Sequence, residues 1–331
     1  MSRAYDNAAD GRFPSGRRNL IINGGMEVAQ RGTSVTGQTA NGYYTLDRWR
    51  QVASGATFDS SQQTLTLGQS DIPAQFRYFQ RFNVTSGGDN CGPQTRIEDV
   101  NRFDGTLVTL SFYAKGTNPS GGHITVVLDQ IFGSGGSTTV SLSEDVTLTS
   151  SWQRFTVTKT LGSLSGKTVG TSSYLGVKFN QPSDDNTTNA WSIDFTGVQL
   201  EYGNVATPFE HRSYGEELAL CQRYYTKVTV DSANDSFGVG LCDGSGNATG
   251  DVFFPVTMRL APTALEQTGT ASDYEIRKTG STITCNLTPD YIRASQFQST
   301  VSFNASGLTT GQAALIRAAT TSAYLAWSAE L

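Results

Sequence analysis

Charged side chains are scarce in this sequence. Lys, Arg, Asp and Glu make up 16% of the 331 residues, against about 25% in a typical globular protein. The net charge is −5, and no basic run is longer than the pair Arg17-Arg18. Because a nucleic-acid-binding surface needs clustered basic residues, we expect no nucleic-acid partner. The acidic balance also argues against binding a polyanionic polymer.

Long apolar runs are missing as well. No stretch reaches the ~20 apolar residues of a membrane-spanning helix, so we expect no membrane insertion. Residues 1–18 are polar and lack the apolar core of a secretory leader. They cannot bury enough apolar surface to fold alone. Two interpretations of this segment stay open: a frayed end, or an arm that becomes ordered on a partner.

Cysteine and histidine are few and scattered. No two of Cys91, Cys221, Cys242 and Cys285 have the short spacing of zinc ligands. We expect four free thiols, with two disulfides as the alternative. Neither of the two histidines has a metal-ligand spacing, and no Gly-x-Ser-x-Gly turn or phosphate loop is present. We therefore predict that the protein is not an enzyme, although spacing does not exclude the two carboxylates of a glycosidase.

Glycine and alternating apolar residues are plentiful. Glycine accounts for 35 of the 331 residues, a larger share than the usual ~7%. This abundance suits short strands joined by tight turns. Apolar residues alternate with polar ones in 107–114, 175–179 and 191–195, which is typical of half-buried strands. The pattern predicts an all-β protein with an N-terminal jelly-roll β-sandwich.

A short helix is predicted where this alternation stops. Residues 213–216, Ser-Tyr-Gly-Glu, form a capping box. Tyr214, Leu218, Cys221 and Tyr225 follow at helical spacing. We expect a short linking helix within residues 213–226. Its apolar stripe packs either on its own chain or on symmetry mates around a fibre axis.

Strand signals resume in the C-terminal third and predict a small β-sandwich. We expect Phe237, Val239 and Leu241 to share one face. Residues 252–260 read as a strand that Pro255 confines to an edge or bulge. Residues 311–319 read as one or two helical turns, and 323–327 as a last strand.

Two segments carry a family resemblance. Residues 19–32 contain Asn-Gly-Gly-Met-Glu, and residues 191–212 contain Ser-Ile-Asp-Phe followed by Gln-Leu-Glu-Tyr-Gly and Ala-Thr-Pro-Phe-Glu-His-Arg. Together they resemble the opening and closing strands of jelly-roll carbohydrate-binding modules, which open with Asn-Gly-Gly-Phe-Glu and close with Ile-Asp-Asp-Val. The second run resembles bacteriophage tail-fibre and other virion adhesin proteins. Residues 254–263 and 328–331 resemble the distal domains of phage fibres.

This resemblance implies a virion structural protein, a tail or capsid fibre that recognises a host-surface glycan. The alternatives are a decoration or assembly protein that binds other virion proteins and no glycan, and an enzyme that degrades host polysaccharide. The expected partners are host glycan, other virion proteins and two further copies in a homotrimer. A phage product released by lysis needs no export signal, and a cytosolic protein fits that point equally. The predicted parts are a flexible docking arm (1–18), the jelly roll (19–212), the helical linker (213–226) and a β-sandwich tip (227–331).

A structural calcium is the sharpest chemical implication of the resemblance. In the carbohydrate-binding modules, calcium sits where the first and last strands meet, held by carboxylate and carbonyl oxygens, the ligands that this ion prefers. The matching positions are Glu27 and Asp194. The second aspartate of the family is Phe195 here, so one ligand is missing. The alternative is that both are ordinary surface or turn carboxylates.

Ligand contacts are predicted at a few further residues. Tyr43, Tyr44 and Trp49 are candidates for sugar stacking, although Trp49 and Trp191 fit a core better. Tyr291 and Arg293 read as lying in a loop of the tip, where recognition residues often sit. In the arm, basic side chains could pair with an acidic virion partner; these are Arg3, Arg12, Arg17 and Arg18.

Overall fold

The computed structural model describes residues 17–66, 68–88, 90–119, 122–181 and 190–331. The chain forms two compact units, Met1–Glu217 with Leu331, and Leu218–Glu330. Arg3 and Arg12 of the predicted arm lie outside the described residues.

The fold is all-β, as predicted. Besides strands and loops, the described residues contain helix α2 (Tyr214–Gln222) and two 3-10 turns, η1 (Val100–Phe103) and η2 (Ala271–Asp273). No helix of the described segments is long and apolar enough to cross a membrane.

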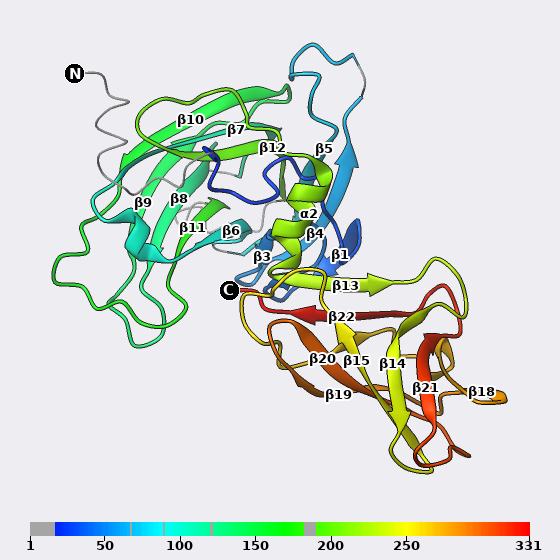
Figure 1. Ribbon diagram of the computed structural model, residues 1–331. Coiled ribbons are helices and arrows are strands. Elements are labelled where there is room, and N and C mark those ends of the chain that lie inside the picture. The colour runs from blue at the N-terminus through cyan, green and yellow to red at the C-terminus, as the bar shows by residue number, and fades with distance from the viewer. Residues whose placement is uncertain (1–16, 67, 89, 120–121, 182–189) are drawn as a thin grey trace. The chain divides into compact units, whose positions relative to one another are not determined.

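The first unit is a sandwich of two antiparallel six-stranded sheets (Figure 1). In spatial order, sheet I contains β1 (Ser34–Gln38), β4 (Thr57–Thr64), β5 (Tyr78–Ser86), β12 (Trp191–Tyr202), β7 (Leu107–Thr117) and β10 (Gln153–Thr160). Sheet II contains β2 (Gly42–Tyr43), β3 (Arg50–Val52), β6 (Gly92–Glu98), β11 (Tyr174–Asn180), β8 (Ile124–Ile131) and β9 (Val140–Val146).

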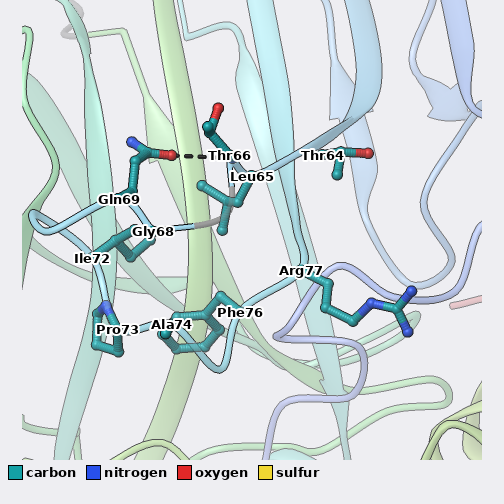
Figure 2. A pocket seen from close by; sticks show the side chains of 10 residues that line it. All are labelled: Thr64, Leu65, Thr66, Gly68, Gln69, Ile72, Pro73, Ala74, Phe76 and Arg77. Carbon is teal, nitrogen blue, oxygen red and sulfur yellow. Dashed lines mark hydrogen bonds between the residues drawn. The ribbon is translucent and has the colours of Figure 1, made fainter.

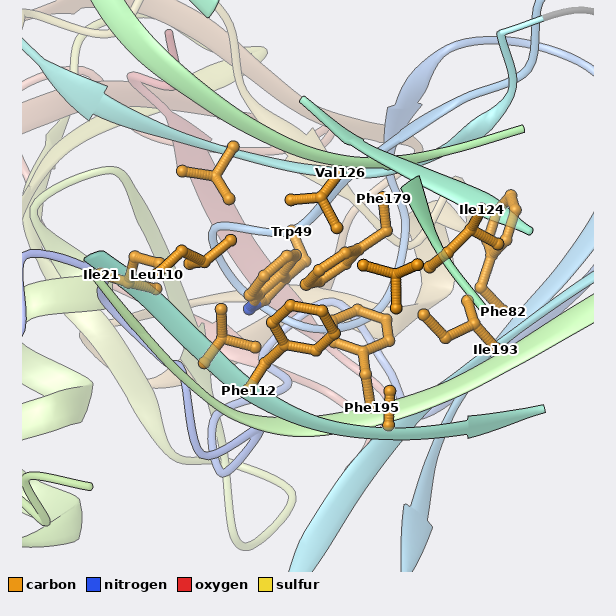
Figure 3. Packing of buried hydrophobic residues seen from close by; sticks show 14 of the residues in the cluster. Ile21, Trp49, Phe82, Leu110, Phe112, Ile124, Val126, Phe179, Ile193 and Phe195 are labelled. Atoms are coloured by element: carbon orange, nitrogen blue, oxygen red, sulfur yellow. The ribbon is translucent and has the colours of Figure 1, made fainter. Parts of the chain in front are cut away.

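Aromatic side chains fill the space between these sheets (Figure 3). The Phe112 and Phe179 rings lie 4.6 Å apart between centroids, and the Phe195 ring lies 4.9 Å from Phe179. Trp49 joins them at 5.0 Å from Phe195. Trp49 and Trp191 are 0% and 1% exposed, so the core interpretation of both is confirmed. Strand alternation predicted this core because successive side chains point to opposite faces.

The segment 19–32 contains no strand over its apolar start, so the predicted opening strand is wrong there. It still lies against β12, as expected, because the amide of Leu20 donates to Leu200 O at 3.0 Å. Asn23, at φ 57°, organises the turn. Its side chain donates to Val28 O at 2.8 Å and to Asp47 O at 2.9 Å, and accepts from the amides of Glu27 and Val28. The Asn-Gly-Gly-Met-Glu motif is therefore held by the chain's own hydrogen bonds.

Helix α2 begins as the capping box predicts. Ser213 Oγ accepts from the amide of Glu216 at 3.3 Å. The helix ends at Gln222, and Tyr225 begins strand β13, so the predicted stripe is too long by one member. Cys221 is fully buried, whereas Tyr214 is 57% exposed. All four cysteines are free and buried.

The second unit contains a three-stranded sheet III and a seven-stranded sheet IV, which share a core around Trp327. Sheet III is formed by β13 (Tyr225–Thr229), β22 (Tyr324–Ser328) and β16 (Glu266–Gln267). Sheet IV is formed by β18 (Ser281–Thr284), β17 (Tyr274–Lys278), β21 (Ala313–Ala318), β14 (Ser236–Cys242), β15 (Asn247–Phe253), β20 (Gln298–Asn304) and β19 (Leu287–Ala294).

Three local predictions for this unit are wrong. Phe237 is 7% exposed but Val239 is 68% exposed, because the register shifts between Ser236 and Gly238 and so reverses the facing of the rest of β14. The strand expected over 252–260 ends at Phe253, before the proline that cannot donate to a ladder. Residues 313–318 form strand β21 and not helical turns.

Candidate ligand-binding site

The face of sheet II that points away from the core carries a row of polar side chains. In β11, Val177 and Phe179 are fully buried in the core, so Lys178 between them lies on the opposite face. Directly opposed residues of antiparallel strands share a face. From β2 to β9, the register therefore aligns Tyr43, Arg50, Gln94, Lys178, Val127 and Ser143. We call this set the polar row.

A cavity of about 330 Å³ opens on this face, which is within the lower range of small-molecule sites. Its walls come from strands β8, β9 and β11 and from Asn90, in the turn before β6. We call it the sheet II cavity. Its lining residues are Asn90, Thr125, Val127, Asp129, Ser141, Ser143, Lys178 and Asn180.

Most polar groups in the cavity are held in place by hydrogen bonds. Lys178 Nζ donates to Asn90 O at 2.5 Å, and Asn180 Nδ2 donates to Asn90 Oδ1 at 2.8 Å. Ser141 Oγ donates to Asp129 Oδ1 at 2.5 Å. Asn180 is 4% exposed, yet its Oδ1 has no hydrogen-bond partner in the part of the chain described. A buried acceptor without a partner is costly to the fold.

Burial lowers the pKa values of two cations in the polar row. It lowers the pKa of Lys178 to about 8, against the opposing effect of the Asp129 carboxylate. Burial also lowers the pKa of Arg50, and the Arg96 guanidinium adds to this effect. Both shifts follow because a less hydrated site and a like charge each disfavour the charged form.

Gly176, which has no side chain, leaves a depression in the middle of this face. A Cβ atom on Gly176 would lie 3.1 Å from Gln94 Nε2 and 3.5 Å from the Asp129 Cβ. Beside it, the Arg96 guanidinium lies over the Tyr174 ring, 4.6 Å from its centroid. The face thus combines hydrogen-bonding groups, cations and aromatic rings around a shallow hollow.

Of the aromatic residues predicted to stack on sugars, one lies on this face. Tyr43 is opposite Arg50 in the polar row, with the Arg31 guanidinium 5.2 Å from its ring centroid. Tyr44 packs edge-on against the buried Phe58 ring, 5.9 Å between centroids.

The residues predicted to hold calcium have other contacts. Both oxygens of Asp194, on β12, accept from the Arg81 guanidinium at 2.7 and 2.8 Å. Glu27 is half-buried, and its pKa is raised by desolvation and then by the Glu217 charge. Among the described residues, no group of three or more His, Cys, Asp or Glu could hold a metal ion. A structural calcium at these two residues stays a prediction.

The residues predicted in the tip lie in a strand and not in a loop. Tyr291 and Arg293 belong to β19 at the edge of sheet IV. Tyr291 Oη donates to Pro262 O at 2.8 Å, and Arg293 Nε donates to Thr300 Oγ1 at 3.4 Å. Their part in ligand binding stays a prediction.

The described arginines of the arm differ in their contacts. Arg17 forms an ion pair of 2.6 Å with Glu216, and both side chains are exposed. Arg18 is exposed as well.

A second hollow, of about 220 Å³, lies within residues 64–77 (Figure 2). Its walls are largely apolar and include Leu65, Ile72 and Phe76, which belong to a small core on the outer side of sheet I. None of the predicted site residues lines it.

Sequence reasoning did not single out Lys178, Asp129 or Asn180. The sequence does show polar residues that alternate with the apolar ones in 124–131 and 174–180. Alternation places these polar residues on one face of each strand. Only the register shows that the two strands are neighbours.

No protein-family model matches the chain, and no curated protein matches it. Among solved structures, the fold is similar to a CBM4 carbohydrate-binding module (TM-score 0.33, 18% identity, 55% of this chain and 99% of the other). It is similar to a family 11 carbohydrate-binding module of Clostridium thermocellum (0.31, 12%, 53% and 97%). It is also similar to part of bacteriophage CBA120 tailspike protein 4 (0.33, 13%, 56% and 21%). At these values the matches carry no argument about ligand or role, which must come from the chain's own residues.

Proposed function

We propose that the first unit binds a glycan at the sheet II cavity and that the chain is a non-enzymatic phage virion protein, a tail or capsid fibre that attaches to the host surface. The observation that carries the binding role is a cavity of about 330 Å³ on an outer sheet face, lined largely by hydroxyl, amide, carboxylate and ammonium groups. Sugar hydroxyls both donate and accept, so they complement such a mixture.

The virion role is supported by the motifs of residues 199–212, which resemble phage fibres. Under this proposal the protein acts on the particle, outside the cell. The basic residues at its start dock on other virion proteins, and three copies assemble. Three weak sugar sites in one particle would raise avidity without new contacts.

The enzymatic alternative has one structural candidate. Glu27 and Glu217 are close enough for the Glu217 charge to raise the pKa of Glu27. Glu217, however, is 7% exposed, accepts from the Asn23 amide at 2.5 Å and pairs with Arg212 at 3.2 Å. Neither glutamate lines the two cavities described above, which supports binding without turnover.

Glycan binding is tested on an array of host-surface and reference glycans. We expect wild-type protein to bind, and Asn180→Ala and Asp129→Asn to bind at least about tenfold more weakly, since Asp129 loses its charge toward the ligand and Asn180 loses the contact that holds Asn90 in the cavity wall. Asn286→Ala, which removes an exposed amide of the second unit, is the matched control and should bind as the wild type does. Release of reducing ends from a bound polysaccharide would favour the enzyme instead.

A second candidate, an assembly protein that binds virion proteins and no glycan, is favoured by exposed apolar side chains on sheet IV. Val239 and Leu315 are directly opposed on β14 and β21, and Leu241 and Phe253 lie on the same face. Phe253 is 69% exposed. Such a patch is typical of a protein interface. The test is Val239→Lys. If this variant has a lower mass by light scattering and still binds glycan, this face is the trimer interface. If the array shows no binding at all, the assembly role is preferred.

A further inference from the structure

Two cations of the polar row lack counter-ions. Neither Arg50 nor Lys178 forms an ion pair with any carboxylate of the described segments. Asp129 influences the charge of Lys178, but its Oδ1 accepts from Ser141. Half-buried charges without a partner are costly to a fold. Lys178 Nζ donates to the carbonyl of Asn90, but no carboxylate of the described segments neutralises either cation, which points to an anion supplied from outside.

The register shows where such an anion would lie. Arg50 and Lys178 both lie opposite Gln94, one on each side. Their Cα atoms are thus two strand spacings apart, about 9.5 Å. Both side chains are long, and Lys178 Nζ, which donates to Asn90 O in the free protein, would turn from that carbonyl to meet Arg50 above Gln94. Burial lowers the pKa of Lys178 most, and the Arg50 charge lowers it further.

Resting on the glycan-binding role proposed above, we propose that the sugar bound at the sheet II cavity is acidic, with its carboxylate held between Lys178 and Arg50. A carboxylate accepts charge-assisted hydrogen bonds from ammonium and guanidinium groups together. The hydroxyls of the same sugar then meet the Asp129 carboxylate and the serine hydroxyls that line the cavity. The net charge of −5 does not describe this face, where cations lie in the middle of the row.

The experiment compares acidic oligosaccharides with their own uncharged forms. The probes are trigalacturonate and sialyllactose, each beside its methyl ester, measured by isothermal titration calorimetry with the full chain. We expect at least one acid to bind about tenfold or more tightly than its ester, because esterification removes the charge-assisted contacts. The difference should shrink at high salt, since partly exposed charges are screened.

Variants assign the effect to the two cations. Lys178→Met and Arg50→Met should each bring the affinity for the acid close to that for the ester, and Lys178→Arg, which keeps the charge, should retain most of the preference. Lys278→Met, on strand β17 of the second unit, is the control and should change nothing.

The outcomes separate this inference from the function on which it rests. Esters or neutral array glycans that bind as tightly as the acids overturn the acidic ligand and leave glycan binding intact. Binding of acids that persists unchanged in both methionine variants also overturns it. Absence of binding to every acidic and neutral glycan overturns the proposed function itself.

Discussion

Replacing Lys178 with methionine should change how the stability of the first unit depends on pH. In the folded chain the pKa of Lys178 is lowered from 10.5 to about 8. Between these values the unfolded chain keeps a proton that the folded chain has released, so the free energy of unfolding of the wild type rises with pH. Below pH 8 the side chain is charged in both states, and above 10.5 it is neutral in both, so its contribution is constant there.

The size of this effect follows from the two pKa values. A change from 10.5 to about 8 corresponds to about 3 kcal/mol. Methionine also removes the hydrogen bond from Nζ to Asn90 O, which offsets part of the gain at neutral pH by about 1–2 kcal/mol. The measured quantity is the free energy of unfolding of the variant minus that of the wild type. We expect it to be about 2–3 kcal/mol more positive at pH 7 than at pH 10, whatever the size of the hydrogen-bond loss.

Urea unfolding at several pH values measures this difference. Three of the four tryptophans, Trp49, Trp152 and Trp191, belong to the first unit, so fluorescence reports mainly on the unit that holds Lys178. The control is Lys278→Met in the second unit, whose curve should parallel that of the wild type. Parallel curves for Lys178→Met and the wild type would refute the reasoning, because they would mean that folding does not desolvate this ammonium.

Three further predictions concern the first unit. Gly24→Ala should destabilise it by about 3 kcal/mol or prevent folding in a thermal melt, because a Cβ there would lie 2.1 Å from Val198 O. A chain without residues 1–18 should melt within about 3 °C of the full chain but fail to join the particle in an incorporation assay; normal incorporation would leave the segment as a frayed end. Millimolar calcium tests the predicted metal site: a rise in Tm would place an ion at Glu27 and Asp194, and an unchanged Tm would favour the alternative of ordinary carboxylates, with Arg81 as the partner of both Asp194 oxygens.

Alternation predicted the core strand β7 because its apolar residues follow the strand period. Val108, Leu110, Phe112 and Ala114 are all fully buried along one strand. The same reasoning failed at Val239, where a single irregular step reverses the two faces. Such a step depends on how β14 pairs with β21, and the local pattern of apolar residues does not contain that information.

The candidate site was harder to predict than the core. Its residues come from strands far apart in the sequence, so they meet only through strand order and register. Lys178 faces Gln94 on one side and Val127 on the other, and neither pairing follows from periodicity. The resemblance drew attention to Glu27 and Asp194, which lie in the segments that carry it. Motifs that maintain a scaffold are easier to recognise than a binding face, which varies with the ligand.

Buried and half-buried charges of the first unit differ in whether the chain itself neutralises them. Asp194 is held by a two-point contact with Arg81, and Glu217 by Arg212. Pairs of this kind satisfy buried charge within the chain, and removing one partner leaves the other unpaired. Lys178 differs from them, because its charge is desolvated and no carboxylate of the described residues pairs with it. A fold tolerates such a group where a ligand completes it, at the expense of stability without the ligand. The same substitution should therefore stabilise the free protein at neutral pH and weaken its hold on an acidic sugar, a combination that a purely structural lysine would not produce.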